Sequence, residues 1–155
     1  MNRSRRAGHV ETEVEKRAMR NKAIKGLGEI ALRVANLDRM QRFYEEVIGL
    51  ELIRRFEKSA FFKIADGYGK HAQVLALFDR SAEPGGAKLN AATGTVDHLA
   101  FEIDRQDYDA ERARLEQLGL TVQTAEHAWV HWRSLYVHDP EGNEVELVCY
   151  DPAVG

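Results

Sequence analysis

The chain has 155 residues, of which 44 % are hydrophobic and 30 % are charged, and its net charge is −3. This balance predicts one globular domain, or two small halves that share a core, without general affinity for nucleic acid or membranes. No apolar run approaches the roughly 20 residues that span a bilayer. The lone Cys149 excludes an internal disulfide, so a cytoplasmic location is expected.

The N-terminal segment, residues 1–25, differs in charge from the rest of the chain. It carries eight Lys or Arg and three Glu, a balance of +5, which leaves −8 for the remainder. It has no convincing apolar face, so a flexible basic arm is expected. A docking arm for a second subunit and a nucleic-acid arm are the alternatives, and the acidic body opposes the latter.

The first half, residues 26–79, begins with a predicted strand in which Ile30, Leu32 and Val34 share one face. Asn36 or Asp38 can cap a helix that runs to the glycine at position 49. Three further strands are predicted after the helix, over residues 50–56, 60–65 and 73–78.

Turn-forming residues over 80–95 predict a linker, after which the second half, residues 96–151, repeats the same order. A strand at 96–103 precedes a helix capped by Asp104 or Asp107 and ended by Gly119. Strands are predicted at 121–123, 133–137 and 145–150, with a tight turn at 139–143 and a short tail at 152–155.

Each half therefore has the order β-α-β-β-β, which predicts an α+β fold of two tandem modules forming a partly open, barrel-like cup. One helix covers only one face of each sheet. The other face, here called the open face, must be buried against its copy or line a cavity.

Three polar residues are predicted on this open face: Glu29, His98 and Glu146. If the halves pair about a pseudo-two-fold axis, their side chains can converge. Two carboxylates about 4 Å apart repel by about 4 kcal/mol at an effective dielectric near 20, so a proton or a cation must relieve them. The set suits a divalent metal with open positions. The alternative is three ordinary polar residues in a wet cleft.

The repeated β-α-β-β-β order resembles the vicinal oxygen chelate superfamily over about residues 26–151. The resemblance also rests on two motifs: Phe43-Tyr44 followed by Gly49-Leu50, and Asp139-Pro140-Glu141-Gly142-Asn143 followed by Glu146. That superfamily includes glyoxalase I, the extradiol ring-cleavage dioxygenases, and the bleomycin and fosfomycin resistance proteins. The resemblance implies the fold and a metal cup, and it leaves the reaction open.

Within the superfamily, the spacing of His127, Tyr136, residues 139–142 and Glu146 resembles the extradiol dioxygenases, although Ala125 departs from their pattern. The resemblance implies that His98 and Glu146 are metal ligands. It makes His127 an acid–base or hydrogen-bonding group and Tyr136 a donor to a substrate oxygen.

Two further departures concern the ligands. The resemblance expects His where this chain has Glu29, and two carboxylates with one His suit Mn²⁺, Mg²⁺ or Zn²⁺ better than Fe²⁺. The resemblance to glyoxalase I also implies a Glu ligand from the last strand of the first half, and this ligand is missing here because the repeat places Val74 opposite Glu146. Gln73 and His71 are its nearest substitutes.

The sequence thus predicts a small-molecule enzyme with one divalent metal (Fe²⁺, Mn²⁺, Ni²⁺ or Zn²⁺), and ring cleavage of a catechol-like substrate is the favoured reaction. A glyoxalase-like lyase or isomerase is the second reading, and a non-catalytic drug-binding or resistance protein is the third. No nucleic-acid or membrane partner is expected, and a homodimer is left open.

Overall fold

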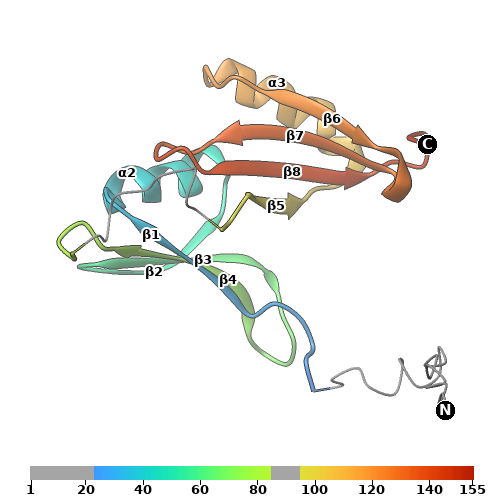
Figure 1. The fold of residues 1–155 in the computed structure, drawn as a ribbon. Helices are drawn as coiled ribbons and strands as arrows, with labels where there is room; N and C mark the ends of the chain where they lie inside the picture. Colours follow the sequence, from blue (N-terminus) through green and yellow to red (C-terminus); the bar gives the residue numbers. More distant parts are fainter. Residues whose placement is uncertain (1–22, 85–94) are drawn as a thin grey trace, which may run out of the picture.

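The computed structural model describes residues 23–84 and 95–155. Nearly all of the expected basic arm (1–25) and most of the expected linker (80–95) therefore lie outside the described residues. Figure 1 shows two sheets, one built from each half of the chain. No helix within the described ranges is both long and apolar enough to cross a membrane.

The first module contains strands β1 (Glu29–Val34), β2 (Glu51–Phe56), β3 (Ser59–Asp66) and β4 (Ala72–Asp79) in the order β1-β4-β3-β2. Helix α2 (Leu37–Arg42) follows β1 and continues as a π-helical turn over Phe43–Val47. The Asn36 side chain accepts a hydrogen bond from the Arg39 amide, as its capping role predicts. Gly49 ends the helix with a φ of +88°, a conformation that glycine adopts without strain.

The second module repeats this arrangement, with β5 (His98–Glu102), α3 (Tyr108–Gln117), β6 (Gln123–His127), β7 (Trp132–His138) and β8 (Glu144–Tyr150). Its strand order is β5-β8-β7-β6. Strand β6 begins where the predicted strand at 121–123 was expected to end. Its five residues pair with β7, and this ladder holds a polar segment that carries no apolar signal in the sequence.

The helix-facing residues of both modules form one contiguous core. It includes Leu32 and Leu77 from the first sheet and Leu99 and Leu147 from the second. The modules are also joined by a polar contact, because the buried Tyr44 hydroxyl donates to Asp139 Oδ2 at 3.0 Å. The predicted α+β fold of two tandem modules is confirmed, and the two sheets do not close into a barrel.

The residues of the open faces follow from the ladder registers, since directly paired residues share a face. In the second sheet, Ala100 pairs with Glu146. In the first sheet, Ala31 pairs with Ala76, and Glu29 pairs with Val74. The first-sheet counterpart of Glu146 is therefore Ala76. The predicted match with Val74 is wrong by two residues because β8 and β4 meet their parallel partners at different distances from their ends.

Candidate metal centre

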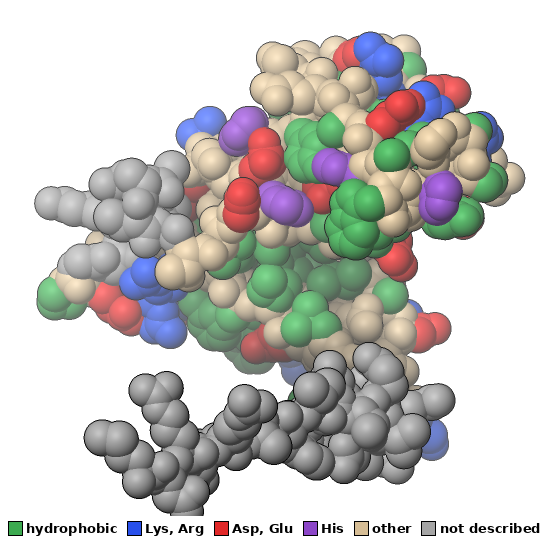
Figure 2. Space-filling view, turned by 45° about the vertical axis from the view of Figure 1, so that its right-hand side comes forward, with side chains coloured by type: hydrophobic (Ala, Val, Ile, Leu, Met, Phe, Trp, Pro, Cys, Tyr) green, Lys and Arg blue, Asp and Glu red, His purple; other side chains and the backbone are tan. Residues whose placement is uncertain are grey.

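The candidate centre lies on the open face of the second sheet. Leu99 and Phe101 of β5 are buried in the core, so the alternation along the strand turns His98 to the other face. Histidine and acidic side chains gather on this face in the upper half of Figure 2. The same alternation along β8 buries Val145 and Leu147 and places Glu146 on the face of His98.

Glu146 contacts three other polar side chains on this face, and only 2 % of its surface is exposed. Its Oε2 lies 3.1 Å from Nε2 of His98. Its Oε1 accepts hydrogen bonds from Ser134 Oγ at 2.5 Å and from the Tyr136 hydroxyl at 3.2 Å. A buried carboxylate costs free energy unless it is paired, and these three contacts supply the pairing.

His127 extends the network by one step. Its Nε2 lies 3.1 Å from the Tyr136 hydroxyl oxygen. Tyr136 has one proton and gives it to the Glu146 carboxylate, which can only accept, so the geometry assigns the donating role in the next contact to His127 Nε2–H. Burial raises the pKa of Tyr136, so this phenol keeps its proton at neutral pH. The order of donation is His127 to Tyr136 to Glu146.

Two further acidic residues, Asp97 and Glu144, lie close to His98. Asp97 Oδ1 lies 3.8 Å from His98 Nδ1. Ligand atoms of Asp97, His98 and Glu144 all lie within 4.8 Å of one another. These three residues and Tyr136 line a hollow of about 330 Å³ beside β6. The sequence predicts no role for Ser134, Asp97 or Glu144, although strand alternation places Glu144 on the same face as Glu146.

Glu29 lies apart from this group. It is exposed on the open face of the first sheet, and its side chain makes no hydrogen bond or ion pair within residues 23–84 and 95–155. The structure thus brings four of the five predicted site residues together: His98, Glu146, Tyr136 and His127. It leaves Glu29 on the other sheet.

Of the remaining polar candidates, His71 and Gln73 line a hollow of about 500 Å³ beside the start of β1, together with Gly28. Gln73 also lines a second hollow, of about 240 Å³, together with His98. His131 has a positive φ of 57°, and its Nδ1 lies 2.5 Å from the carbonyl oxygen of Val154. That contact holds the end of the chain against the β6–β7 connection.

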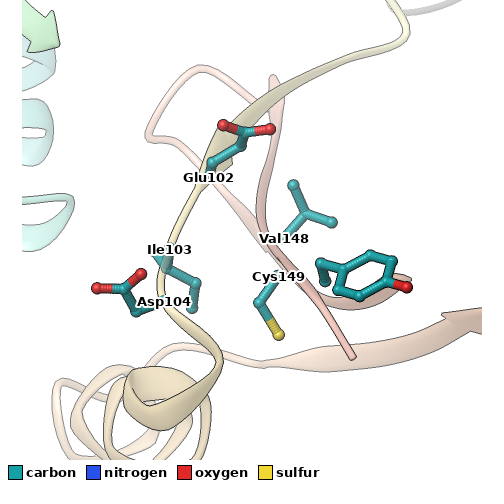
Figure 3. A pocket seen from close by; sticks show the side chains of 6 residues that line it. Glu102, Ile103, Asp104, Val148 and Cys149 are labelled. Carbon is teal, nitrogen blue, oxygen red and sulfur yellow. The ribbon is translucent and has the colours of Figure 1, made fainter. Parts of the chain in front are cut away.

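A further hollow of about 380 Å³ lies at the opposite end of β5 from His98. It is lined by Glu102, Ile103, Asp104, Val148, Cys149 and Tyr150. Figure 3 shows that the carboxylates of Glu102 and Asp104 point in different directions. Burial raises the pKa of the Cys149 thiol, which disfavours the reactive thiolate. This hollow therefore brings no convergent ligands together.

The donor set around Glu146 fits a divalent cation. Two ligand atoms bound to one ion at about 2.1 Å and at right angles lie about 3 Å apart. The separation between His98 Nε2 and Glu146 Oε2 is 3.1 Å. Ser134 and Tyr136 hold the carboxylate through its other oxygen, which is the outer contact that orients a ligating group.

Two tandem βαβββ modules with a histidine and a carboxylate on an open sheet face define a class of proteins built around a metal cup. The chain belongs to the Glyoxalase/Bleomycin resistance protein/Dioxygenase superfamily, whose family model matches residues 26–147.

The relatives of this chain differ in their reactions. A lactoylglutathione lyase of Neisseria meningitidis is 30 % identical over 76 % of this chain and 85 % of its own length. A catechol-2,3-dioxygenase of Bacillus subtilis is 26 % identical over 81 % of this chain, which spans only 42 % of that enzyme. A solved FosX fosfomycin resistance protein of Listeria monocytogenes, in complex with Mn(II) and a dihydroxypropylphosphonic acid, shares the fold. Its TM-score is 0.63 at 22 % identity, over 84 % of this chain and 95 % of that one.

Proposed function

We propose that this chain is a metal-dependent enzyme that binds a small molecule through two neighbouring oxygens. One observation carries the proposal: the contact of His98 with Glu146 continues through Tyr136 to His127 within hydrogen-bonding distances. This series of contacts links two metal-binding groups, His98 and Glu146, with two groups suited to proton transfer, Tyr136 and His127. A bound divalent ion would supply Lewis-acid stabilisation of the substrate oxygens.

Each residue has a distinct role in this proposal. His98 and Glu146 would hold the ion. Tyr136 keeps its proton and donates it to Glu146 in the free protein, and it would turn this hydrogen bond to a substrate oxygen when the substrate binds. His127 holds or moves a proton next to Tyr136, from which its Nε2 is 3.1 Å away. The location proposed for this chemistry is the cytoplasm, since the lone Cys149 is a free, buried thiol.

Glu29 is the proposed third ligand, and we place it in a homodimer. The helix-facing sides of both sheets share one core, so Glu29 and His98 point to outer faces of different sheets within one chain. A second copy can present the partner's Glu29 to the open face that carries His98. Sharing one site across a two-fold interface creates two equal sites per dimer.

Mixing two inactive variants tests this arrangement. Glu29→Ala and His98→Ala each remove one ligand from every site, so each homodimer loses Mn²⁺ binding. After unfolding and refolding the two together, half of the dimers are mixed, and about a quarter of all sites regain both ligands if the site is shared. Calorimetry or manganese spin resonance counts these sites. Failure of the mixture to recover any binding places Glu29 outside a shared centre.

The proposed reaction is extradiol-type ring cleavage of a catechol-like substrate, supported by the pairing of His127 with Tyr136 next to Glu146. Glu29 favours a second candidate, a glyoxalase-like lyase or isomerase. Two carboxylates and one His leave a bound Fe²⁺ site formally neutral, with less attraction for a catecholate than a site of two His and one carboxylate. A non-catalytic binding or resistance role is the third outcome.

Loading with Fe²⁺ distinguishes these reactions. Anaerobic loading, followed by catechol and oxygen, yields a yellow ring-opened product if the protein is an extradiol dioxygenase. We expect slow cleavage by the wild type and faster cleavage by Glu29→His. Metal binding without any cleavage, but with isomerisation of a hemithioacetal, supports the lyase. Failure to bind Mn²⁺, Fe²⁺, Ni²⁺ or Zn²⁺ at all leaves only the binding role.

A further inference from the structure

The open face of the first sheet carries a row of aromatic rings, Phe56, Phe61 and Phe78, here called the phenylalanine row. The ring centroids of Phe56 and Phe61 are 6.0 Å apart, and those of Phe61 and Phe78 are 5.7 Å apart. Both pairs meet edge to face, at 89° and 87°. Phe56 is 54 % exposed, so the row remains open to a ligand. Phe61 and Phe78 are half-buried, so the three rings form one contiguous apolar surface, of the kind that marks interaction sites when it is exposed.

Two arginines, Arg33 and Arg54, lie beside this row. The Arg54 guanidinium lies 5.5 Å from the centroid of the Phe56 ring, and Arg33 pairs in the ladder with Phe78. Within the described part of the chain, neither arginine forms an ion pair. Arg80 over the same row, by contrast, is neutralised by Glu83 at 2.6 Å. Among the described residues, Arg33 and Arg54 are therefore positive charges without an ion-pair partner next to apolar rings.

Comparison of the two modules shows how the open face of the first sheet differs from that of the second sheet, which carries the candidate metal centre. The register aligns Phe61 and Ala76 with Tyr136 and Glu146, because each pair of residues is directly opposed in its own ladder. Arg33 follows Ala31 by two residues in β1, so it lies on the same face as Ala76. Where the second sheet presents hydroxyl and carboxylate groups, the first presents rings and guanidinium groups.

We propose that the phenylalanine row, Arg33 and Arg54 form a substrate-binding wall for an aromatic molecule with an anionic group remote from its metal-binding oxygens. The proposal rests on the proposed function, because Glu29 shares its sheet face with Arg33. A centre completed by Glu29 is therefore bounded by this wall. Four residue steps along the strand lead from Glu29 to Arg33, about 13 Å between Cα atoms, which leaves room for a ring and a short side chain. Guanidinium groups bind carboxylate or phosphate through paired hydrogen bonds.

Binding of caffeate and of its methyl ester tests the wall directly. The two probes share the catechol ring and the side chain, and only caffeate carries the terminal negative charge. With the Mn²⁺-loaded full chain in calorimetry, we expect caffeate to bind about tenfold more tightly than the ester. Arg33→Gln or Arg54→Gln removes most of this preference and leaves the Mn²⁺ affinity unchanged. Phe56→Leu weakens binding of both probes alike.

The matched control is Arg42→Gln, which removes an equally exposed arginine from the end of α2. Equal affinity of the wild type for acid and ester, or equal losses from Arg42→Gln and Arg33→Gln, overturns the proposal. Mn²⁺ titration separates this failure from that of the proposed function. If Mn²⁺ binds and the preference for the acid is absent, the wall is wrong and the metal centre stands. If Mn²⁺ does not bind but the metal-free chain keeps an Arg33-dependent preference, the metal centre is wrong and the wall stands.

Discussion

The hydrogen bond from Ser134 to Glu146 offers a sharp test of the proposed metal centre. Ser134 is fully buried, and its Oγ donates to Glu146 Oε1 at 2.5 Å. The variant Ser134→Ala deletes one oxygen from a site that water does not reach. Glu146 keeps the hydroxyl of Tyr136 at 3.2 Å as a weaker donor to the same oxygen.

The expected magnitude follows from the charge of the acceptor. A hydrogen bond to an ionised group contributes about 1.5–3 kcal/mol, so Ser134→Ala destabilises the metal-free protein by about that amount. Loss of a group that orients a ligand lowers metal affinity by about 10–100-fold. Chemical denaturation measures the first effect, and titration with Mn²⁺ measures the second.

The chain contains its own control for this experiment. The ladder registers place Ser59 of β3 at the position that corresponds to Ser134 of β7, opposite Phe78 and Val148 respectively. The acid that corresponds to Glu146 is replaced there by Ala76, so Ser59→Ala loses no carboxylate contact. We expect Ser59→Ala to leave metal affinity unchanged. If Ser134→Ala lowers stability but leaves Mn²⁺ affinity at the wild-type value, Glu146 is not a ligand and the proposed centre is wrong.

Four further predictions concern stability. Tyr44→Phe removes the hydroxyl that donates to Asp139 and should lower the free energy of unfolding by about 2 kcal/mol, or the Tm by about 4–8 °C. Tyr108→Phe, which loses only a 3.2 Å bond to the Ser134 carbonyl oxygen, should cost about half as much in the same denaturation experiment. Arg105, at 2.9 Å, holds the pKa of Asp151 below its ordinary value of 3.8. The stability that this carboxylate contributes is therefore fully present above that value and is lost as the pH falls through the lowered pKa. Asp151→Asn should therefore make the free energy of unfolding depend less steeply on pH below about pH 4. An unchanged pH dependence contradicts this prediction. Gly142→Ala forces a side chain into a φ of +86° and should cost about 1–2 kcal/mol in unfolding, whereas an unchanged midpoint contradicts the strain.

The sequence predicted most of the fold because its two strongest signals are local. Strand alternation turned His98 and Glu146 toward one face, and Asn36 and Gly49 marked the ends of the first helix. These signals depend on neighbours along the chain, so no long-range contact was needed to find them.

The remaining errors came from non-local registers. The similar endings of β4 and β8 suggested that Val74 corresponds to Glu146, whereas the parallel ladders assign that place to Ala76. A register shift between Lys63 and Ala65 of β3 also has no sequence signature strong enough to read. The location of Glu29 on a separate outer face depends on how the two modules share a core, which no local pattern encodes.

The turn between β7 and β8 belongs to the second module, but it also binds the start of the first helix. Glu141 accepts hydrogen bonds from the Ala35 and Asn36 amides, each at 2.8 Å, across 106 and 105 residues of sequence. The start of the first helix therefore lacks this anion until the second half has been synthesised. At about 5–20 residues per second, a ribosome takes about 5–20 s to supply it. During that interval the first helix keeps its local cap from Asn36 but lacks the contact with Glu141, and the nascent first half carries an unmatched apolar surface. It therefore depends on the rest of the chain, or on a chaperone, to reach its native state.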